Sequence, residues 1–221
     1  MTKSIAYYID HTLLKPAVCL PDIDKLCAEA IEFGFAAVCV PPFVVEQSVK
    51  VLSGTTISTS TVIGFPMGYS CLDAKMAEID RAIDEGADEL DVVINLIALK
   101  NGDWHYLGNE MKKMTKRIHE KEKIIKVIVE SGILTRAELS RCCEVYGPMG
   151  IDFMKTSTGY AEKGATISDV QFMRANLPKG VKIKASGGIR HYGFASELIE
   201  AGADRIGCSS SVQIVNEERV A

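Results

Sequence analysis

Short apolar runs rich in β-branched residues alternate with longer amphipathic stretches along the whole of this sequence. The apolar runs predict eight strands, near residues 9–12, 36–40, 57–65, 89–95, 124–130, 152–157, 181–186 and 205–208. The stretches between them predict seven helices, near residues 21–32, 42–52, 71–85, 104–120, 136–146, 168–176 and 192–201. Such strict alternation is typical of a parallel sheet whose strands are joined by helices, so the predicted fold class is α/β.

Among α/β folds, eight strands in this order favour a single closed (β/α)8 barrel, also called a TIM barrel, with a short N-terminal lead-in. The first strand is short and mixed in composition, so the pattern alone leaves a doubly wound open sheet as an alternative. No linker or low-complexity stretch divides the chain, and a barrel of 221 residues is of ordinary size. We therefore interpret residues 1–221 as one domain.

Composition and charge exclude several classes of function. The chain is 47% hydrophobic and 24% charged, with a formal net charge of −4, which indicates a globular protein and argues against nucleic acid as its main partner. No run of about 18 apolar residues is present, and the first residues lack the apolar core of a signal peptide, so we expect neither a membrane span nor secretion. The seven cysteines are odd in number, have no Cys-X-X-Cys spacing and are not grouped with the four histidines. They predict reduced thiols in the cytoplasm and no metal site.

Two lysines stand inside predicted strands, Lys155 in the sixth and Lys184 in the seventh. Because neighbouring residues of a strand point to opposite faces, the apolar residues around these lysines assign them to the inside of the barrel. The same alternation directs Glu89, Asp91, Lys126, Glu130 and Lys182 inward. In a barrel of this type the active site forms at the carboxyl ends of the strands. We therefore expect Asp91, Lys126, Lys155 and Lys184 to meet in one interior site.

A lysine in such an interior is suited to covalent catalysis. Burial disfavours the charged ammonium and a second ammonium nearby lowers its pKa further, which leaves an amine able to form a Schiff base with a carbonyl compound. Either Lys155 or Lys184 fits this role, with the other as its cationic neighbour. Asp91 is the candidate for proton transfer, and its pairing with Lys126 limits the cost of burying both charges. The alternative is an internal salt-bridge network without catalysis.

Glycine-rich turns follow the last two predicted strands. Gly187 and Gly188 come after the seventh strand, and the segment 207–211, Gly-Cys-Ser-Ser-Ser, leads from the eighth strand into a terminal helix. Glycine backbone allows an anion to approach closely, and the loops after strands seven and eight are a frequent phosphate site in these barrels. Tight turns alone would also account for the glycines. Together the two loops predict a phosphorylated substrate.

Seven segments, in one fixed order, carry a resemblance to a known family. They are Ile9-Asp10-His11-Thr12-Leu13-Leu14-Lys15-Pro16, Gly64-Phe65-Pro66-Met67-Gly68, Glu89-Leu90-Asp91-Val92-Val93-Ile94-Asn95, Lys126-Val127-Ile128-Val129-Glu130, Lys155-Thr156-Ser157-Thr158-Gly159, Lys184-Ala185-Ser186-Gly187-Gly188-Ile189-Arg190 and Gly207-Cys208-Ser209-Ser210. Through nearly the whole chain they resemble the deoxyribose-phosphate aldolases, a family of class I aldolases. The motifs that begin at Lys155 and Lys184 are together highly specific for this family.

The resemblance implies a (β/α)8 barrel and assigns the roles that the residues alone left open. It implies that Lys155 forms the Schiff base and that Lys184 tunes the pKa of Lys155 and joins proton transfer. Asp91 takes the role of proton shuttle, with Lys126 as its charged partner. The implied reaction is the reversible cleavage of 2-deoxy-D-ribose 5-phosphate to acetaldehyde and D-glyceraldehyde 3-phosphate. It belongs to deoxyribose catabolism and needs no metal or organic cofactor.

The resemblance further implies a phosphate site and an oligomer. The phosphate-binding positions of the family correspond here to Gly187, Gly188, Ser209 and Ser210, with Thr158 nearby. Two departures bear on that site: Tyr160 stands where some relatives have a lysine, and Ser211 where a glycine is frequent. The family implies a homodimer or homotetramer. Two rival interpretations are another Schiff-base barrel aldolase acting on a different sugar phosphate, and a barrel that isomerises or only senses a sugar phosphate.

Overall fold

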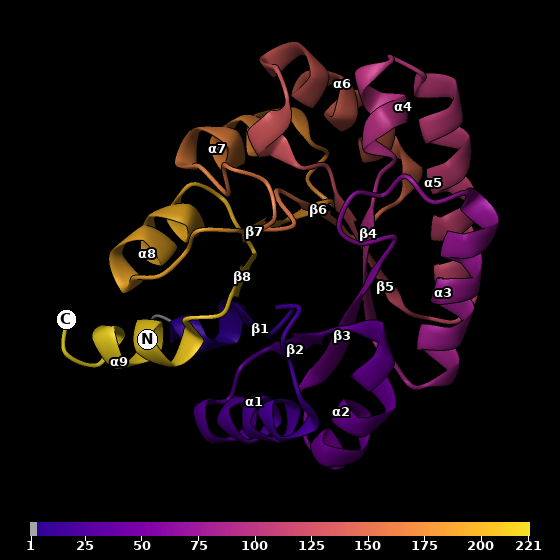
Figure 1. The fold of residues 1–221 in the computed structure, drawn as a ribbon. Helices are drawn as coiled ribbons and strands as arrows, with labels where there is room; N and C mark the ends of the chain where they lie inside the picture. Colours follow the sequence, from indigo (N-terminus) through magenta and orange to yellow (C-terminus); the bar gives the residue numbers. More distant parts are fainter. Residues whose placement is uncertain (1–3) are drawn as a thin grey trace.

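The computed structural model describes residues 4–221, in which eight parallel strands close into a barrel (Figure 1). The strands are β1 (Ile9–Thr12), β2 (Ala37–Val40), β3 (Ser58–Ile63), β4 (Glu89–Val93), β5 (Ile124–Ile128), β6 (Phe153–Lys155), β7 (Lys182–Ser186) and β8 (Arg205–Cys208). Each strand pairs in parallel with the next, and β8 pairs back onto β1 with Ile206 beside Ile9. This closure confirms the predicted barrel and excludes the open, doubly wound sheet.

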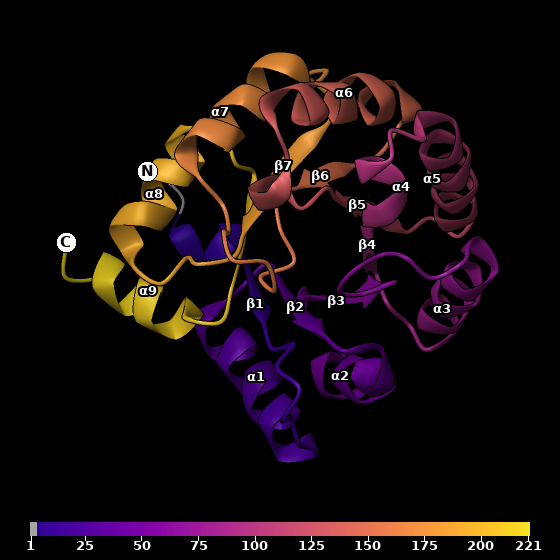
Figure 2. The same ribbon diagram turned by 45° about the horizontal axis from the view of Figure 1, so that its top comes forward.

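Helices follow the strands and form a layer outside the barrel (Figures 1 and 2). They are α1 (Leu20–Phe33), α2 (Val45–Leu52), α3 (Leu72–Asp84), α4 (Leu96–Lys100), α5 (Trp104–His119), α6 (Arg136–Tyr146), α7 (Ile167–Asn176), α8 (Tyr192–Glu200) and α9 (Ser211–Glu218). Four 3-10 turns add η1 (Ile5–Tyr8), η2 (Pro42–Val44), η3 (Ser131–Ile133) and η4 (Gly147–Met149). All seven predicted helices are present. The short α4 was not predicted, because five residues are too few to establish a helical period.

Local signals in the sequence account for the ends of several helices. Thr135 and Glu138 form a reciprocal capping box that starts α6, in which each side chain accepts a hydrogen bond from the other residue's backbone N–H. Asn95 accepts a hydrogen bond from the Ala98 N–H and so starts α4 directly after β4. At the other end of α1, Gly34 adopts a left-handed conformation, with φ of 67°, that ends the helix and turns the chain toward β2.

The main apolar core lies between the barrel and the helices. Alternate residues of the strands, such as Leu90 and Val92 of β4 and Val127 of β5, are buried there against helical side chains that include Met111 and Met114 of α5. Burying each side chain of this size stabilises the fold by about 1.5–3 kcal/mol. The other alternate residues face the barrel axis, as predicted. The polar interior therefore depends on this outer apolar layer for its stability.

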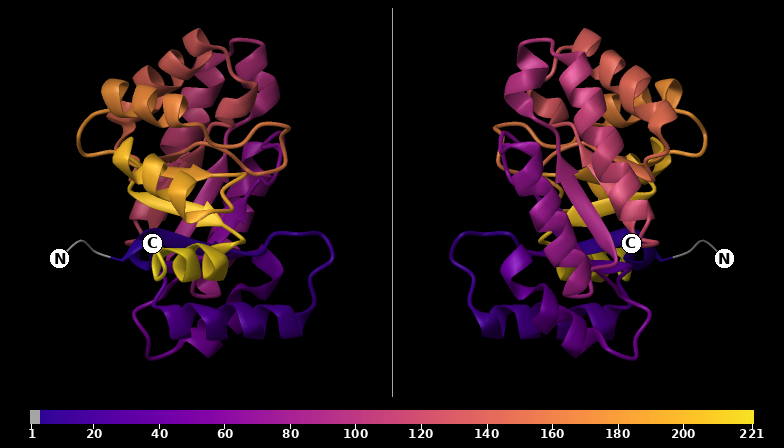
Figure 3. Two further views of the ribbon diagram at one scale, coloured as in Figure 1. Left: turned by 90° about the vertical axis from the view of Figure 1, so that its left-hand side faces the viewer. Right: turned by 90° about the vertical axis from the view of Figure 1, so that its right-hand side faces the viewer.

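Several predicted strands extend beyond the observed ends. The predicted ranges 57–65, 89–95, 124–130 and 152–157 continue past the carboxyl ends of β3, β4, β5 and β6. The sequence stays strand-like there because the following residues remain buried at the mouth of the barrel, as Ile94 and Val129 do. The loop between β1 and α1 projects from the body (Figure 3). In the described part of the chain no helix is both long and apolar enough to span a membrane.

Candidate active site

The carboxylate of Asp91 stands at the centre of the barrel and accepts hydrogen bonds from three lysines. Its Oδ1 is 2.7 Å from Lys126 Nζ, and its Oδ2 is 2.7 Å from both Lys155 Nζ and Lys184 Nζ. The four side chains come from β4, β5, β6 and β7, and all are buried. The strand pairing places Asp91 beside Lys126 and Lys155 beside Lys184, and the second pair lies two residues closer to the carboxyl ends of the strands, since Lys155 is the partner of Ile128. The predicted convergence of these four residues is confirmed.

Three further charged residues extend this network toward the amino ends of the strands, and sequence reasoning gave none of them a role. Asp10 of β1 forms ion pairs with Lys184 and Arg205. Glu89 of β4 lies 2.6 Å from Lys126 Nζ and 3.0 Å from Arg205 Nη2. The network thus joins four cations and three carboxylates, with one positive charge in excess. The alternation of inward and outward side chains predicted that Glu89 faces inward. Asp10 and Arg205 lie on strands too short for this alternation to predict the direction of their side chains.

The charges around the two central lysines act on their pKa values in opposite directions. Burial lowers the pKa of Lys155, and the neighbouring Lys184 ammonium lowers it as well, against the opposing effect of Asp91. Burial also opposes the charge on Lys184, but the carboxylates of Asp10 and Asp91 outweigh it and raise the pKa of Lys184. The Asp91 carboxyl, although buried, has a pKa well below its usual range because of Lys126, Lys155 and Lys184. Lys155 is therefore the lysine disposed to lose its proton, beside a Lys184 that keeps it.

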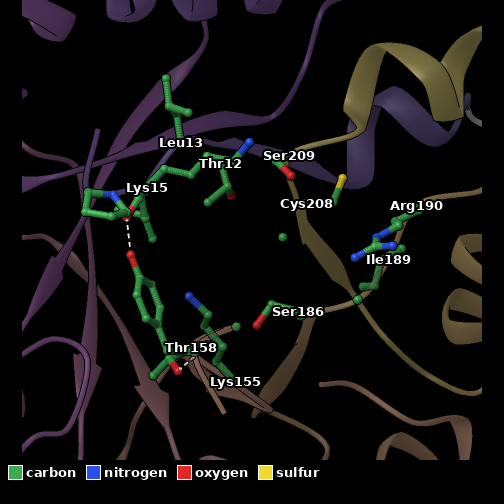
Figure 4. A pocket seen from close by; sticks show the side chains of 17 residues that line it. Thr12, Leu13, Lys15, Lys155, Thr158, Ser186, Ile189, Arg190, Cys208 and Ser209 are labelled. Atoms are coloured by element: carbon green, nitrogen blue, oxygen red, sulfur yellow. Dashed lines mark hydrogen bonds between the residues drawn. The ribbon is translucent and has the colours of Figure 1, made fainter. Parts of the chain in front are cut away.

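A cavity of about 400 Å³ opens above this network at the carboxyl ends of the strands, and Lys155 lies in its lining. The amino group of Lys155 points into this cavity (Figure 4). The loops after β1, β6, β7 and β8 form the remaining walls. This is the end of the barrel at which such folds bind substrates. A carbonyl compound in the cavity has direct access to the Lys155 amine.

Four of the five predicted phosphate-binding residues line the same cavity. They are Thr158, Gly187, Gly188 and Ser209. Gly187 has a φ of 89° and lies so close to the loop before α7 that a Cβ atom would stand 3.0 Å from Gly164 Cα, so only glycine fits there. Ser210, the fifth, lines an adjacent hollow instead, together with His11 and Glu29.

Two other residues that the sequence analysis singled out, Lys182 and Ser211, lie outside the Lys155 cavity. Lys182 is on the inward side of β7, as predicted, but it is exposed at the opposite mouth of the barrel, with its Nζ 5.4 Å from the centre of the Phe153 ring. It therefore lies outside the Lys155 cavity. The reason is its position as the first residue of the strand, which alternation does not take into account. Ser211 is buried and its Oγ lies 2.9 Å from His11 Nδ1, so it does not face the cavity.

Tyr160 closes part of the cavity wall. Its hydroxyl donates a 2.6 Å hydrogen bond to the carbonyl oxygen of Leu14, in the loop after β1. Its ring meets the ring of Phe65 edge to face, with the centroids 5.3 Å apart. Tyr160 thus connects the loops that follow β1, β3 and β6 across the mouth of the barrel.

Comparison with known proteins agrees with this geometry. A family model described as DeoC/LacD family aldolase matches residues 4–213. The deoxyribose-phosphate aldolase of Thermococcus gammatolerans is 47% identical over 217 residues, which cover 97% of this chain and 96% of that protein. A solved structure of the tetrameric deoxyribose phosphate aldolase from Aeropyrum pernix has a TM-score of 0.91 and 31% identity, covering 97% of this chain and 91% of that one. The resemblance found in the motifs is confirmed, and the chain belongs to the DeoC/LacD family of aldolases, enzymes of the lyase class.

Proposed function

We propose that this protein is a deoxyribose-phosphate aldolase that cleaves 2-deoxy-D-ribose 5-phosphate reversibly through a Schiff base on Lys155. The observation that carries the proposal is the position of Lys155, whose amine faces the cavity while its pKa is lowered by burial and by Lys184. The names of relatives that match almost the full chain support the choice of substrate. A salt-bridge network without catalysis does not require a lysine to line an open cavity.

The reaction begins when the neutral amine of Lys155 attacks C1 of the open-chain aldehyde. Loss of water gives an imine, and the protonated imine then acts as the electron sink for the next step. Asp91, through a water molecule, removes the proton of the 3-hydroxyl group, and the C2–C3 bond breaks as its electrons move into the imine. D-Glyceraldehyde 3-phosphate leaves, and an enamine of acetaldehyde remains on Lys155. Protonation at C2 and hydrolysis release acetaldehyde and restore the amine.

Lys184 and Lys126 set the protonation states that this sequence of steps requires. Lys184 keeps its proton because Asp10 and Asp91 stabilise the charge, and its ammonium in turn disfavours a proton on Lys155. Lys126 donates to Asp91 at 2.7 Å and helps to keep the Asp91 carboxyl ionised. Asp91 is thereby available as a base near neutral pH, and Lys184 as a proton donor.

The substrate phosphate fits at the loops after β7 and β8. We assign it to the backbone N–H groups of Gly187 and Gly188 and to Ser209 and Ser210, with Thr158 nearby. Gly187, Gly188 and Ser209 line the cavity, and Ser210 occupies the N-cap position of α9, where the helix dipole favours an anion. Because this region and Lys155 line the same cavity, one substrate that carries both an aldehyde and a phosphate can reach both.

The setting of the reaction is also part of the proposal. Its products suit a role in deoxyribose catabolism, and the seven unpaired cysteines suit a reducing cytoplasm. A homo-oligomer is expected because the related Aeropyrum pernix enzyme is a tetramer. Light scattering of the purified protein measures its mass directly, and a monomer at all concentrations would contradict this part.

Two measurements test the proposed function. Steady-state cleavage of deoxyribose 5-phosphate, deoxyribose and fructose 1,6-bisphosphate is compared side by side, and we expect the first to give the highest kcat/KM. Borohydride reduction in the presence of acetaldehyde should leave a two-carbon adduct on the Lys155 peptide and none on the peptide that contains Lys75, a buried lysine outside the barrel. Preference for fructose 1,6-bisphosphate would favour the rival aldolase, and an unmodified Lys155 in folded protein would contradict the Schiff base.

A further inference from the structure

The carboxyl group of Glu130 is buried behind the cavity wall, in the loop that follows β5. Within residues 4–221 its hydrogen-bond donors both belong to Thr158. The Thr158 N–H lies 3.2 and 3.3 Å from the two carboxylate oxygens, and the Thr158 hydroxyl donates a short hydrogen bond to Oε2. Burial raises the pKa of Glu130, while the hydrogen bonds from Thr158 and the charge of Lys155 oppose that rise. Glu130 itself is not part of the cavity lining, but Thr158 is.

The backbone of Glu130 is also in an unfavourable state. Its φ and ψ are both 57°, in the left-handed region that glycine adopts easily and glutamate rarely does. The next two residues restrict the path of the backbone at this point. The Ser131 N–H donates a 2.7 Å hydrogen bond to the Thr156 carbonyl oxygen, and a Cβ at Gly132 would lie 2.2 Å from the Lys163 carbonyl oxygen. A buried carboxylate and a strained backbone thus coincide at one residue, which points to a role for its side chain.

Thr158 passes the influence of Glu130 on to the rest of the β6–α7 loop. The Thr158 Oγ accepts a 3.0 Å hydrogen bond from the Tyr160 N–H, and Tyr160 in turn donates to Leu14. The far end of the loop is fastened to β7 by the Ala165 N–H, which donates to the carbonyl oxygens of Ser186 and Gly187. Glu130 therefore stands at one end of a continuous chain of hydrogen bonds along the cavity wall.

The same bonds decide which polar partner Thr158 can offer to a substrate. A hydroxyl group has one proton and two acceptor lone pairs. The proton of Thr158 is committed to Glu130 and one lone pair to Tyr160 N–H, so only an acceptor lone pair is left for the cavity. A phosphate oxygen, itself an acceptor, gains nothing from such a group, whereas a sugar hydroxyl can donate to it.

We propose that Glu130 is a positioning residue that holds Thr158 as a hydrogen-bond acceptor for a hydroxyl group of the substrate. The proposal rests on the proposed function and refines it, because it moves Thr158 from the phosphate to the hydroxyl-bearing carbons of the sugar. Glutamine at this position presents an NH2 group to Thr158, which allows the threonine proton to turn toward the cavity. The acceptor then becomes a donor, with almost no change in the shape of the side chain.

The test uses the synthetic direction, in which acetaldehyde adds to D-glyceraldehyde 3-phosphate or to its analogue without the 2-hydroxyl group, 3-oxopropyl phosphate. We expect Glu130→Gln to lower kcat/KM for glyceraldehyde 3-phosphate roughly tenfold to a hundredfold, as for a buried hydroxyl donor left without its acceptor. The value for 3-oxopropyl phosphate should change less than threefold. Thr158→Val should give the same pattern, and the double variant should lose no more than the worse single variant.

Matched controls separate this role from a structural one. Glu122 is also in the left-handed region, with φ of 56°, but it is exposed in the turn before β5, so Glu122→Gln should leave both reactions unchanged. Thr158→Ser keeps the hydroxyl group and should restore the preference for glyceraldehyde 3-phosphate. An equal loss with both aldehydes in Glu130→Gln, or no loss with either, would overturn the proposal. Borohydride trapping of acetaldehyde on Lys155 should succeed in every variant, which shows that the nucleophile is intact. Failure of trapping in the wild type would instead refute the proposed function.

Discussion

Lys155 and Lys75 are both buried lysines paired with carboxylates, but they lie in different parts of the molecule. Lys155 projects into the barrel from β6, whereas Lys75 belongs to α3 and lies in the apolar layer between the barrel and the helices. Burial lowers the pKa of both. A lowered pKa on its own therefore does not distinguish a nucleophile from a structural lysine.

The two lysines differ in their partners and in their access to solvent. Lys75 Nζ donates to the Glu110 carboxylate at 3.1 Å and to the Val93 carbonyl oxygen at 3.0 Å, and is fully buried. Its side chain packs so closely on Gly64 that a Cβ there would lie 2.9 Å from Lys75 Cε. Lys155 instead shares one carboxylate with two other ammonium groups and lies in a cavity wall. Shared counter-charge and access to a cavity, rather than burial, distinguish Lys155, the proposed nucleophile, from Lys75.

Replacement of Lys155 should produce the largest effect on activity. Lys155→Leu removes the group that forms the imine, so we expect cleavage of deoxyribose 5-phosphate to fall by about 10⁴-fold or more. The fold should persist, because Asp91 keeps Lys126 and Lys184 as partners. Steady-state rates and circular dichroism check both expectations. Appreciable turnover in this variant would show that the nucleophile is wrongly assigned.

Replacement of Lys184 should change both the rate and its dependence on pH. We expect Lys184→Leu to lower kcat by about 10²- to 10³-fold, because a proton donor is lost. The Lys184 ammonium also lowers the pKa of Lys155. Without it Lys155 keeps its proton to higher pH, so the acidic limb of the pH–rate profile should move upward. A rate loss with an unmoved profile would assign Lys184 to structure alone.

Replacement of Lys75 should affect stability instead of chemistry. Lys75→Met leaves Glu110 buried without its cation, which is expected to cost about 3–5 kcal/mol of unfolding free energy. Urea denaturation measures this loss. Acetaldehyde trapping on Lys155 should be unchanged in the folded variant. The double variant Lys75→Met/Glu110→Leu should recover much of the stability, and an equally unstable double variant would contradict the ion-pair explanation.

The pH dependence of stability provides a second test of Lys75. Its folded-state pKa lies below the ordinary lysine pKa of 10.5, which applies to the unfolded chain. Between these two values the unfolded state binds the proton more strongly, so this lysine makes wild-type stability rise with pH across that window. Lys75→Met lacks this contribution, so the stability gap between wild type and variant should widen as pH approaches 10.5. A constant gap would show that Lys75 keeps its proton throughout.

Sequence reasoning singled out Lys155, the proposed nucleophile, but not its structural counterpart Lys75, for a physical reason. In a strand, period-two alternation separates two faces, so Asp91, Lys126, Lys155 and Lys184 could be assigned to one interior from the residues alone. In a helix such as α3 the sequence shows where a polar face begins but not that Lys75 turns inward to reach Glu110. That contact joins α3 to α5, residues far apart in the chain.

The same limit applies to the outer parts of the site. Arg205 and Asp10 stand on short strands, whose few residues do not establish an alternation, and their pairing became visible only when β8 closed onto β1. Glu130 was assigned inward by alternation, but its link to Thr158 depends on a left-handed turn that no pattern of residue types announces. The family motifs identified the family because they preserve residues in order, whereas the hydrogen bonds that orient those residues depend on the closed barrel.

Tyr160 should give the smallest effect, because it lines the cavity wall and is not among the residues proposed to carry the chemistry. Tyr160→Phe keeps the ring contact with Phe65 but loses the hydrogen bond to Leu14, which leaves the loops after β1 and β6 less firmly joined. We expect KM for deoxyribose 5-phosphate to rise about two- to tenfold, as for loss of one neutral hydrogen bond, with kcat almost unchanged. Tyr7→Phe, at an exposed tyrosine of η1, is the matched control and should alter neither constant. If Tyr160→Phe lowers kcat while KM stays constant, the tyrosine takes part in a chemical step. Tyr160 would then belong with Lys155 among the residues that carry the chemistry, and not with those that only line the cavity.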